Sequence, residues 1–439
     1  RSHCMNACMG RRSSTPWRSY EQPSPRTSRM CVPTSVSNLI WLMKLTGLRV
    51  SFVHDYLGLG GAETVSRQTG RLFAQLGIFT HYYCLEHRAE QWQLPDAEYC
   101  SLSLLPDKKK LWSKTNVSYL IEDAKRRGIS VLIIPVSSRN KCYPELRASG
   151  LKLIYWLHTS PFDEVPSILR VMEERSNRSL LRRIEWLAFK QLWEVKLGAT
   201  RRRIHKRYRH ILEHVDGFIT LCPAYSQEII RTLQLPKELA EKIHAVQNTI
   251  ELPPADSIQF TKQKKIVYMG RLDPISKRVP RLVQIWARIQ ESLPDWEVEI
   301  YGEGSDRQHL EMLISQLQLP RIFLRGYCAD PSRIYQSASI LALTSQLESW
   351  GLALAEAQSY GCIPITFDCS AGVRTVIGEA PSCGVLIPAY DQEIYARELY
   401  RLCQDDALRR DLQGACLLKS LTYAHEQNLP VWRKILEEL

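Results

Sequence analysis

The chain has 439 residues and a formal net charge of +12, with 44% hydrophobic and 24% charged residues. These values are ordinary for a globular protein of two or three domains, and no apolar run reaches the roughly 18 residues that a transmembrane helix needs. The 13 cysteines show no paired spacing, which argues against a disulfide framework and favours a reducing, cytoplasmic compartment.

Residues 1–42 are rich in Ser, Pro and Arg and lack apolar periodicity, so we predict a disordered leader there. After it, strands alternate with helices in two similar parts, the pattern of doubly wound parallel sheets with helices on both faces. We place the first part over residues 43–252 and the second over residues 262–421, with the proline pair at residues 253–254 in the linker. We expect a last helical segment, residues 422–439, to cross back to the first part.

Short apolar runs define the expected strands. In the first part they are residues 49–54, 78–84, 130–135, 151–157 and 217–221. In the second part they are residues 265–269, 296–301, 322–325, 340–344 and 363–367. Ligands of doubly wound sheets bind beyond the carboxyl ends of the strands, so the polar residues that follow these runs are the candidates for a site.

Two candidates follow strands of the first part. The Gly58–Glu63 turn precedes a helix, where glycines allow a ligand to approach the backbone and the helix N-terminus favours an anion. Its last position is Glu63, so the dinucleotide-binding pattern G-x-G-x-x-G is incomplete and a plain tight turn is the alternative. His158 ends the fourth strand, where either a functional or a structural role is open.

Charged candidates follow strands of the second part. Arg271 comes directly after the strand at residues 265–269, and Lys277 lies just before the next helix. Two fixed cations can neutralise a diphosphate, the group that leaves when a nucleotide sugar reacts. Two surface cations without a ligand are the alternative.

The strongest pattern is Glu348-Ser-Trp-Gly-Leu-Ala-Leu-Ala-Glu356, at the start of an expected helix. Carboxylates that face a cleft can accept hydrogen bonds from sugar and ribose hydroxyls. The amides at the helix N-terminus are available to anions or hydroxyls, and they belong to Trp350, Gly351 and Leu352. A solvated amphipathic helix is the alternative.

Some motifs are missing from the sequence. We find no Asp-x-Asp motif for a divalent cation, no His/Cys cluster with zinc spacing and no nucleophile elbow of a hydrolase. We therefore expect a site without metal or cofactor, in which cationic side chains and helix dipoles act on the diphosphate.

These residues together resemble glycosyltransferase family 4 and its two-Rossmann GT-B fold. The family's Glu-x7-Glu element matches Glu348 and Glu356, and its Gly-Arg-Leu…Lys element matches residues 270–272 and Lys277, with one extra residue in the gap. Further matches are Gly60–Glu63, His158, Asn248, Gly384, Pro388 and Asp391. A Gly-Gly-x-Pro-Glu loop common in the family is replaced by residues 371–375, which leaves the donor's identity open.

The resemblance implies retaining transfer of a hexose-type sugar from a nucleotide-diphosphate sugar to a glycan, lipid-linked or other hydroxyl acceptor, in polysaccharide or glycoconjugate synthesis. The implied contacts with the donor are diphosphate binding by Arg271 and Lys277, ribose binding by Glu356, and sugar binding by Glu348 and His158. Gly61 would let the first turn approach the donor phosphate or the acceptor.

Three alternatives remain open at this point. A nicotinamide-dependent oxidoreductase would use the first part alone, but the incomplete glycine pattern and the unexplained second part count against it. A non-catalytic partner that binds a sugar nucleotide would keep the same residues. The spacing of Glu348 and Glu356 makes a nucleotide-sugar epimerase a poorer match.

The stretch Arg170–Arg209 contains 13 Lys and Arg residues and four Glu residues. It predicts either solvated helix faces or attraction to anionic lipid headgroups or phosphorylated acceptors. We expect no nucleic-acid partner, because no recognised binding motif accompanies the charge. The lipid interpretation predicts a cytoplasmic protein with peripheral contact on the inner face of the membrane.

Overall fold

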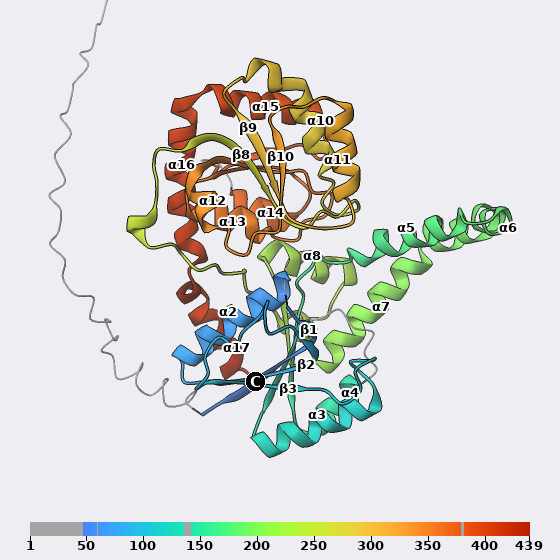
Figure 1. Cartoon of the computed structure of the whole chain (residues 1–439). Helices are drawn as coiled ribbons and strands as arrows, with labels where there is room; N and C mark the ends of the chain where they lie inside the picture. Colours follow the sequence, from blue (N-terminus) through green and yellow to red (C-terminus); the bar gives the residue numbers. More distant parts are fainter. Residues whose placement is uncertain (1–46, 59, 136–141, 379–381) are drawn as a thin grey trace, which may run out of the picture. The chain divides into compact units, whose positions relative to one another are not determined.

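The computed structural model describes residues 47–439 except residues 59, 136–141 and 379–381. The predicted leader at residues 1–42 lies outside this part. Two α/β lobes follow one another along the chain, each built on one parallel sheet (Figure 1). The two doubly wound sheets predicted from the strand and helix alternation are therefore confirmed.

The N-terminal lobe contains a seven-stranded parallel sheet in the order β3-β2-β1-β4-β5-β6-β7. Its strands are β1 (Arg49–Leu57), β2 (Phe79–His87), β3 (Cys100–Leu104), β4 (Val131–Ile134), β5 (Lys152–Trp156), β6 (Gly217–Thr220) and β7 (Ile243–Ala245). Its helices are α2 (Gly61–Gln75), α3 (Lys114–Arg127), α4 (Tyr143–Ala148), α5 (Glu164–Ser176), α6 (Leu180–Glu185), the π-helix η1 (Trp186–Lys196), α7 (Ala199–His214), α8 (Pro223–Leu233) and α9 (Lys237–Ala240).

The C-terminal lobe contains a six-stranded parallel sheet in the order β10-β9-β8-β11-β12-β13. Its strands are β8 (Gln263–Met269), β9 (Glu297–Tyr301), β10 (Ile322–Gly326), β11 (Ala338–Leu343), β12 (Ile363–Phe367) and β13 (Val385–Ile387). Its helices are α10 (Pro280–Ile289), α11 (Arg307–Gln316), α12 (Ser332–Ser337), α13 (Leu352–Ser359), α14 (Ala371–Ile377), α15 (Gln392–Gln404) and α16 (Asp406–Ser420).

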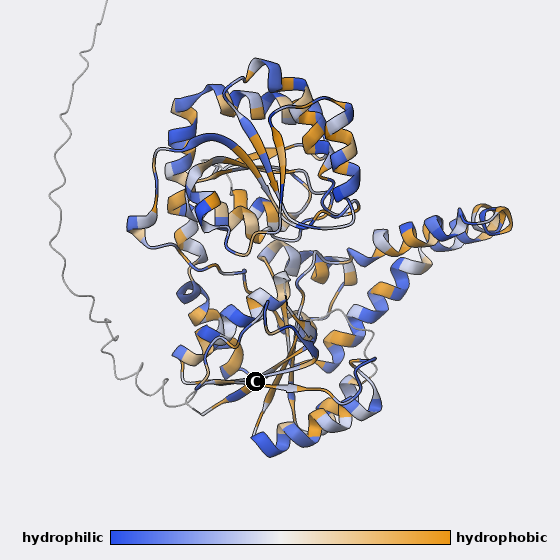
Figure 2. Cartoon of the chain, viewed as in Figure 1, coloured by the Kyte–Doolittle hydropathy of each residue, from blue (hydrophilic) through white to orange (hydrophobic). Residues whose placement is uncertain are grey.

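The strands are hydrophobic along most of their length, as Figure 2 shows for the C-terminal lobe. Every residue of β4, β6, β11 and β12 is buried, because helices cover both faces of each sheet. In both lobes the strand order reverses beside the first strand, between β1 and β4 and between β8 and β11. Loops that follow strands at such a reversal leave a crevice for a ligand.

The ten predicted strands are all present, with ends that differ by no more than three residues. Three strands were not predicted, namely β3, β7 and β13. Each is three to five residues long and lies at the edge of its sheet. A short edge strand has one neighbour and few apolar residues, so its sequence gives a weak periodic signal.

The chain returns to the N-terminal lobe in helix α17 (Leu429–Glu437). Trp432 of α17 is fully buried, and its ring packs edge-on against Phe73 and Trp156 with centroid distances of 5.1 Å to each. The segment before it forms two short 3-10 turns, η4 (Leu421–Tyr423) and η5 (His425–Asn428). The hydrophobic core of the N-terminal lobe therefore includes residues from the end of the chain.

Candidate active site

A cavity of about 760 Å³ opens where loops from the two sheets meet. Its lining residues follow strands β1, β5, β6 and β7 of the N-terminal lobe and strands β8, β9, β10 and β11 of the C-terminal lobe. The cavity thus lies beyond the carboxyl ends of both parallel sheets, the usual ligand position in doubly wound folds.

The structure brings eight of the predicted site residues to this cavity. They are Gly61, His158, Arg271, Lys277, Glu348, Trp350, Gly351 and Leu352. Glu356 is not among the lining residues, although it lies on helix α13 directly behind them.

Arg271 is held in place by its main chain. The amide of Gly270 donates to Tyr301 O at 3.1 Å, and the amide of Leu272 donates to Glu303 O at 2.9 Å. These bonds pin the loop after β8 to the loop after β9. The Arg271 side chain is exposed, and no ion-pair partner for it is found among the described residues. Its backbone is therefore fixed at the cavity, and its guanidinium keeps its hydrogen-bond donors for a ligand.

Gly302 makes this close approach of the two loops possible. Its φ is +139°, and a β-carbon on it would lie 1.9 Å from Gly270 O. We expect Gly302→Ala to push the Arg271 loop away and to lower the free energy of unfolding by about 1–3 kcal/mol. Because Arg271 is displaced, the affinity for the donor nucleotide should fall as well. Denaturant unfolding and nucleotide titration measure the two effects.

Gly414→Ala in α16 is the matched control. A β-carbon there meets no atom within 4 Å, and alanine favours a helix over glycine by about 0.5–1 kcal/mol. Equal stability and equal nucleotide affinity of both variants would contradict the role given to Gly302.

Lys277 and Glu348 form an ion pair in the cavity wall. Lys277 Nζ lies 2.5 Å from Glu348 Oε2, and the side chains are 20% and 15% exposed. The amides of Gln346 and Leu347 both donate to Ser276 O, which fastens the two loops to one another. The pair leaves the other protons of the ammonium and the other oxygen of the carboxylate available to a ligand.

Two helix N-termini face this cavity from opposite lobes. Helix α2 begins after Gly60 and helix α13 after Gly351, and neither has a side-chain cap. Gly61 and Leu352 approach one another there, since a β-carbon on Gly61 would lie 3.7 Å from Leu352 Cδ1. A helix N-terminus carries free amides and partial positive charge, which favour an anion. In α2 the Glu63 carboxyl already accepts a hydrogen bond from its own amide, so the α13 N-terminus is the one that offers its first-turn amides without an acidic residue beside them.

The side chain of Trp350 belongs to the core. It is 1% exposed and packs edge-on against Tyr423 with a centroid distance of 5.3 Å. Its main chain is therefore the part that a ligand can reach, as expected from its place before the helix.

Two histidines lie together at the end of the N-terminal sheet. Burial lowers the pKa of His158 to about 3, and burial together with the neighbouring His158 lowers the pKa of His54 to about 3. Both imidazoles are therefore neutral at pH 7. His158 Nε2 has no hydrogen-bond partner in the described part of the chain, so it can bind a neutral hydroxyl but does not act as a cation.

Several cavity residues received no role from the sequence. Asn248, which only the family resemblance indicated, lines the cavity with its Oδ1 unpartnered among the residues that the structure describes. Others are Tyr56, Glu63, Tyr301, Glu303, Tyr327 and Cys328. All but Glu63 lie at or within three residues of the end of a strand. Strand ends could therefore have indicated them, except for Asn248, which follows the unpredicted strand β7.

Glu356 occupies a different environment from Glu348. Burial raises the pKa of its carboxyl from 4.5 to about 7, and the Tyr335 hydroxyl opposes this increase in part. The residue retains some accessible surface, but no cation is paired with it in the described residues.

The raised pKa of Glu356 gives a pH dependence with a defined sign. Between about pH 4.5 and 7 the folded protein retains a proton that the unfolded chain has lost, so the contribution to the free energy of unfolding falls as the pH rises. Glu356→Gln removes this contribution. We therefore expect the melting temperature of the variant, relative to that of the original protein, to increase between pH 5 and 7.5. A constant difference between the two melting temperatures would contradict the environment assigned to Glu356.

Tyr225 of helix α8 connects the two lobes beside the cavity. Its hydroxyl donates to Ser349 O at 2.7 Å and accepts from the Gly372 amide at 3.1 Å. Ser160 Oγ lies 2.8 Å from the same hydroxyl. The N-terminal lobe thereby positions the residue that follows Glu348.

One group of potential metal ligands is present in the described residues. His210, Glu213 and His214 lie on helix α7 with ligand atoms within 4.8 Å of one another. The sequence analysis found no His/Cys cluster with zinc spacing and therefore did not predict this group of two histidines and a glutamate. None of the three lines the cavity, so they give the candidate active site no metal.

Comparisons with known proteins agree with this geometry. Residues 59–252 match the model of "Glycosyltransferase Family 4", and residues 253–415 match the model of "Glycosyl transferases group 1". The two matches adjoin at the proline pair predicted to mark the linker. The second family model accounts for the C-terminal lobe, which a nicotinamide-dependent oxidoreductase built on the first part alone would leave unexplained.

Individual relatives are more distant. A poly(glycerol-phosphate) alpha-glucosyltransferase of Bacillus subtilis is 23% identical over 55% of this chain and 36% of its own length. An amylovoran biosynthesis glycosyltransferase of Erwinia amylovora is 27% identical over 41% of this chain and 50% of its own length. The chain thus matches half or less of the length of these two relatives.

A solved structure shows the same fold. The pneumococcal O-GlcNAc transferase GtfA, in complex with UDP and GlcNAc, superimposes with a TM-score of 0.66 at 13% identity, covering 89% of this chain and 99% of that one. Because the two family models together account for residues 59–415 and the two lobes have the GT-B arrangement, the chain belongs to the group 1, family 4 glycosyltransferases.

Proposed function

We propose that the chain is a retaining glycosyltransferase that moves a hexose-type sugar from a nucleoside-diphosphate sugar to a glycan, lipid-linked or other hydroxyl acceptor. The observation that carries this proposal is the convergence on one cavity of Arg271, the Lys277–Glu348 pair and the N-termini of helices α2 and α13. The named activities of the two bacterial relatives, on poly(glycerol phosphate) and in amylovoran biosynthesis, support a role in polysaccharide or glycoconjugate synthesis.

The transfer step follows from these groups. The acceptor oxygen forms a bond to the anomeric carbon as the bond from that carbon to the donor phosphate breaks. The nucleoside diphosphate leaves with the electron pair, and one of its phosphate oxygens takes the acceptor's proton. Because this oxygen takes the proton, a separate catalytic base is not required. Arg271 and Lys277 stabilise the negative charge that develops on the phosphate.

The sugar itself would lie between the lobes. Glu348 and neutral His158 can hydrogen-bond to its hydroxyls, and the partial positive charge of the sugar in the transition state is favourable beside the Glu348 carboxylate. Asn248 Oδ1 offers a further acceptor. Glu356 would bind the ribose, and it would do so best when ionised, above its pKa of about 7.

We expect no metal requirement, because two side-chain cations and two helix N-termini are already directed at the diphosphate position. Transfer rates measured with and without EDTA should agree, after dialysis and with a magnesium-dependent enzyme as the positive control for chelation. Loss of activity on chelation and its recovery with a divalent cation would contradict this arrangement.

The anomeric configuration of the product tests the proposed reaction. A thermal-shift screen of nucleoside diphosphates and their sugars first identifies the donor, because a bound donor raises the melting temperature. Proton NMR of the transfer or donor-hydrolysis product should then show the donor's own configuration. An inverted product contradicts the retaining mechanism, and donor binding with no turnover toward any hydroxyl acceptor or water favours the non-catalytic alternative.

We further propose a cytoplasmic location. It was expected from the scattered cysteines, and no disulfide is found in the part of the chain that the structure describes.

A further inference from the structure

Helices α5 to α7, residues 164–214, form a hairpin that projects away from the N-terminal sheet (Figure 1). At its base, Arg207 of α7 is paired with Glu164 of α5, and the Phe162 amide donates to Tyr208 Oη at 3.2 Å. None of its residues lines the candidate active site. The transfer function therefore leaves this projecting hairpin unexplained.

The outer end of the projecting hairpin exposes apolar side chains. Nine of the twenty exposed large hydrophobic residues in the described chain lie within residues 180–197. They are Leu180, Leu181, Ile184, Leu187, Phe189, Leu192, Trp193, Val195 and Leu197. Leu181 is 81% exposed and Phe189 is 73% exposed. Such a concentration of apolar surface is unfavourable in water and marks an interaction site.

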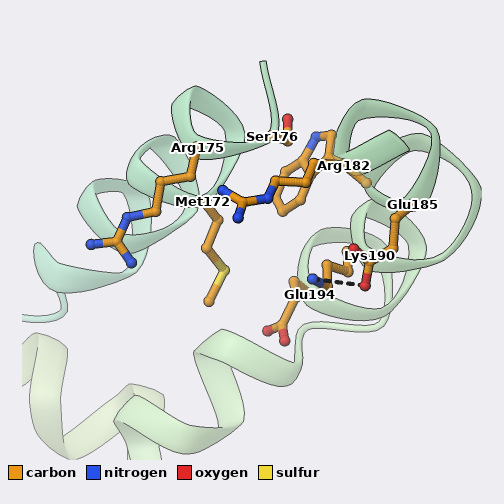
Figure 3. A pocket seen from close by; sticks show the side chains of 8 residues that line it. Met172, Arg175, Ser176, Arg182, Glu185, Lys190 and Glu194 are labelled. Atoms are coloured by element: carbon orange, nitrogen blue, oxygen red, sulfur yellow. Dashed lines mark ion pairs between the residues drawn. The ribbon is translucent and has the colours of Figure 1, made fainter. Parts of the chain in front are cut away.

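A small pocket of about 310 Å³ adjoins this apolar end (Figure 3). Arg175 and Arg182 line it together with Met172 and the nearly buried Trp186. The other three charged residues of the pocket are already paired, since Lys190 pairs with Glu185 at 2.9 Å and Glu194 with Arg203 at 2.9 Å. Among the residues described, Arg175 and Arg182 have no such partner, so the pocket keeps two guanidinium groups for an external anion.

The charge of the projecting hairpin decides which partner fits. Residues 170–209 contain 13 Lys and Arg against four Glu, so two copies of this surface repel one another. A partner must be anionic and must also accept Trp, Phe and Leu side chains. An anionic bilayer does both, because aromatic and leucine side chains enter its interface while Lys and Arg bind the headgroups. Among the described residues, no helix could span a bilayer.

We propose that the projecting hairpin docks the protein on an anionic phospholipid bilayer. Residues 180–197 enter the interface, and the pocket at Arg175 and Arg182 receives a lipid phosphate. The proposal adds apolar insertion and a headgroup pocket to the charge attraction predicted from the sequence, and it does not depend on transfer activity.

Co-sedimentation of the full chain with phosphatidylglycerol vesicles tests the docking, with phosphatidylcholine vesicles as the neutral reference. The apolar variant is Leu181→Ser with Phe189→Ser and Trp193→Ser. Its control changes equally exposed apolar residues elsewhere, namely Phe260→Ser, Met312→Ser and Leu418→Ser. We expect the apolar variant to bind phosphatidylglycerol at least about tenfold more weakly at both low and high salt, and the control variant to bind normally.

The pocket has its own variant. Arg175→Gln with Arg182→Gln should weaken binding mainly at low salt, because salt screens exposed charges. Arg288→Gln with Arg410→Gln, two exposed arginines of the C-terminal lobe, is the charge-matched control. Equal binding by the two double variants would overturn the pocket.

Three results would overturn the docking as a whole. The first is no binding of the original protein to phosphatidylglycerol vesicles at low salt, and the second is unchanged binding by the apolar variant. The third is an original protein that forms a dimer in sedimentation velocity and does not bind vesicles, together with an apolar variant that is monomeric. Hydrogen exchange of residues 180–197 tests the insertion in the original protein, so misfolding of a variant cannot affect the result. The exchange rate of these amides should fall on phosphatidylglycerol vesicles, and an unchanged rate would contradict insertion.

Discussion

Arg271→Ala should lower kcat/KM for sugar transfer by about two to three orders of magnitude, the usual loss when one fixed donor to a developing anion is removed. The Arg271 side chain is exposed and makes no ion pair with any described residue, so its removal costs the fold little. Its charge also reaches Tyr56 and Glu63 across the cavity, where it acts to lower their pKa values against the raising effect of burial. The melting temperature should therefore stay within a degree or two while the rate collapses.

Arg288→Ala is the matched control for this change. Arg288 is an exposed arginine on helix α10 and does not line the cavity, so its variant should retain full activity. Comparable rates for the two alanine variants would show that Arg271 does not stabilise the leaving group.

Lys277→Ala should also lower kcat/KM by about two to three orders of magnitude. The substitution should in addition disturb Glu348, the ion-pair partner of Lys277. Lys277 Nζ lies 2.5 Å from Glu348 Oε2 in a largely buried setting. Removing the lysine leaves a desolvated carboxylate without its cation, which costs about 1–3 kcal/mol in stability. The loss of activity combines a missing phosphate ligand with a Glu348 side chain that is free to reorient.

A double-mutant cycle separates these contributions. Rates and unfolding free energies of Lys277→Ala, Glu348→Gln and the double variant should be non-additive, because the two side chains act as one unit. The double variant should be more stable than Lys277→Ala alone. Strict additivity in both quantities would mean that the ion pair has no functional or structural consequence.

The main positions of the site could be predicted from the sequence because they depend on local order. A parallel sheet places the residue after each strand at one edge, so Arg271, Lys277 and Glu348 were expected to meet once the strands at residues 265–269 and 340–344 were identified. The family resemblance added their roles. Glu356 was assigned to the same group through the family's Glu-x7-Glu element, but it is not among the residues that line the cavity.

Other features depend on contacts between distant segments and could not be predicted. The need for glycine at residue 302 comes from Gly270 O, which lies 1.9 Å from a β-carbon placed there. The hydroxyl of Tyr225 positions Ser349, which lies 124 residues away along the chain. The sequence also indicated the positive charge at residues 170–209 but not the exposure of its apolar residues, because apolar residues at helical spacing ordinarily face a core.

Titration of nucleoside diphosphates against the original protein and an Arg271→Ala/Lys277→Ala double variant tests the diphosphate site most directly. Calorimetry reports binding without requiring the acceptor. We predict that the preferred nucleoside diphosphate binds the original protein at least about 100-fold more tightly than the double variant, since two charge-assisted contacts are lost, while the corresponding nucleoside binds both alike. Equal affinity of the diphosphate for the two proteins would contradict the account.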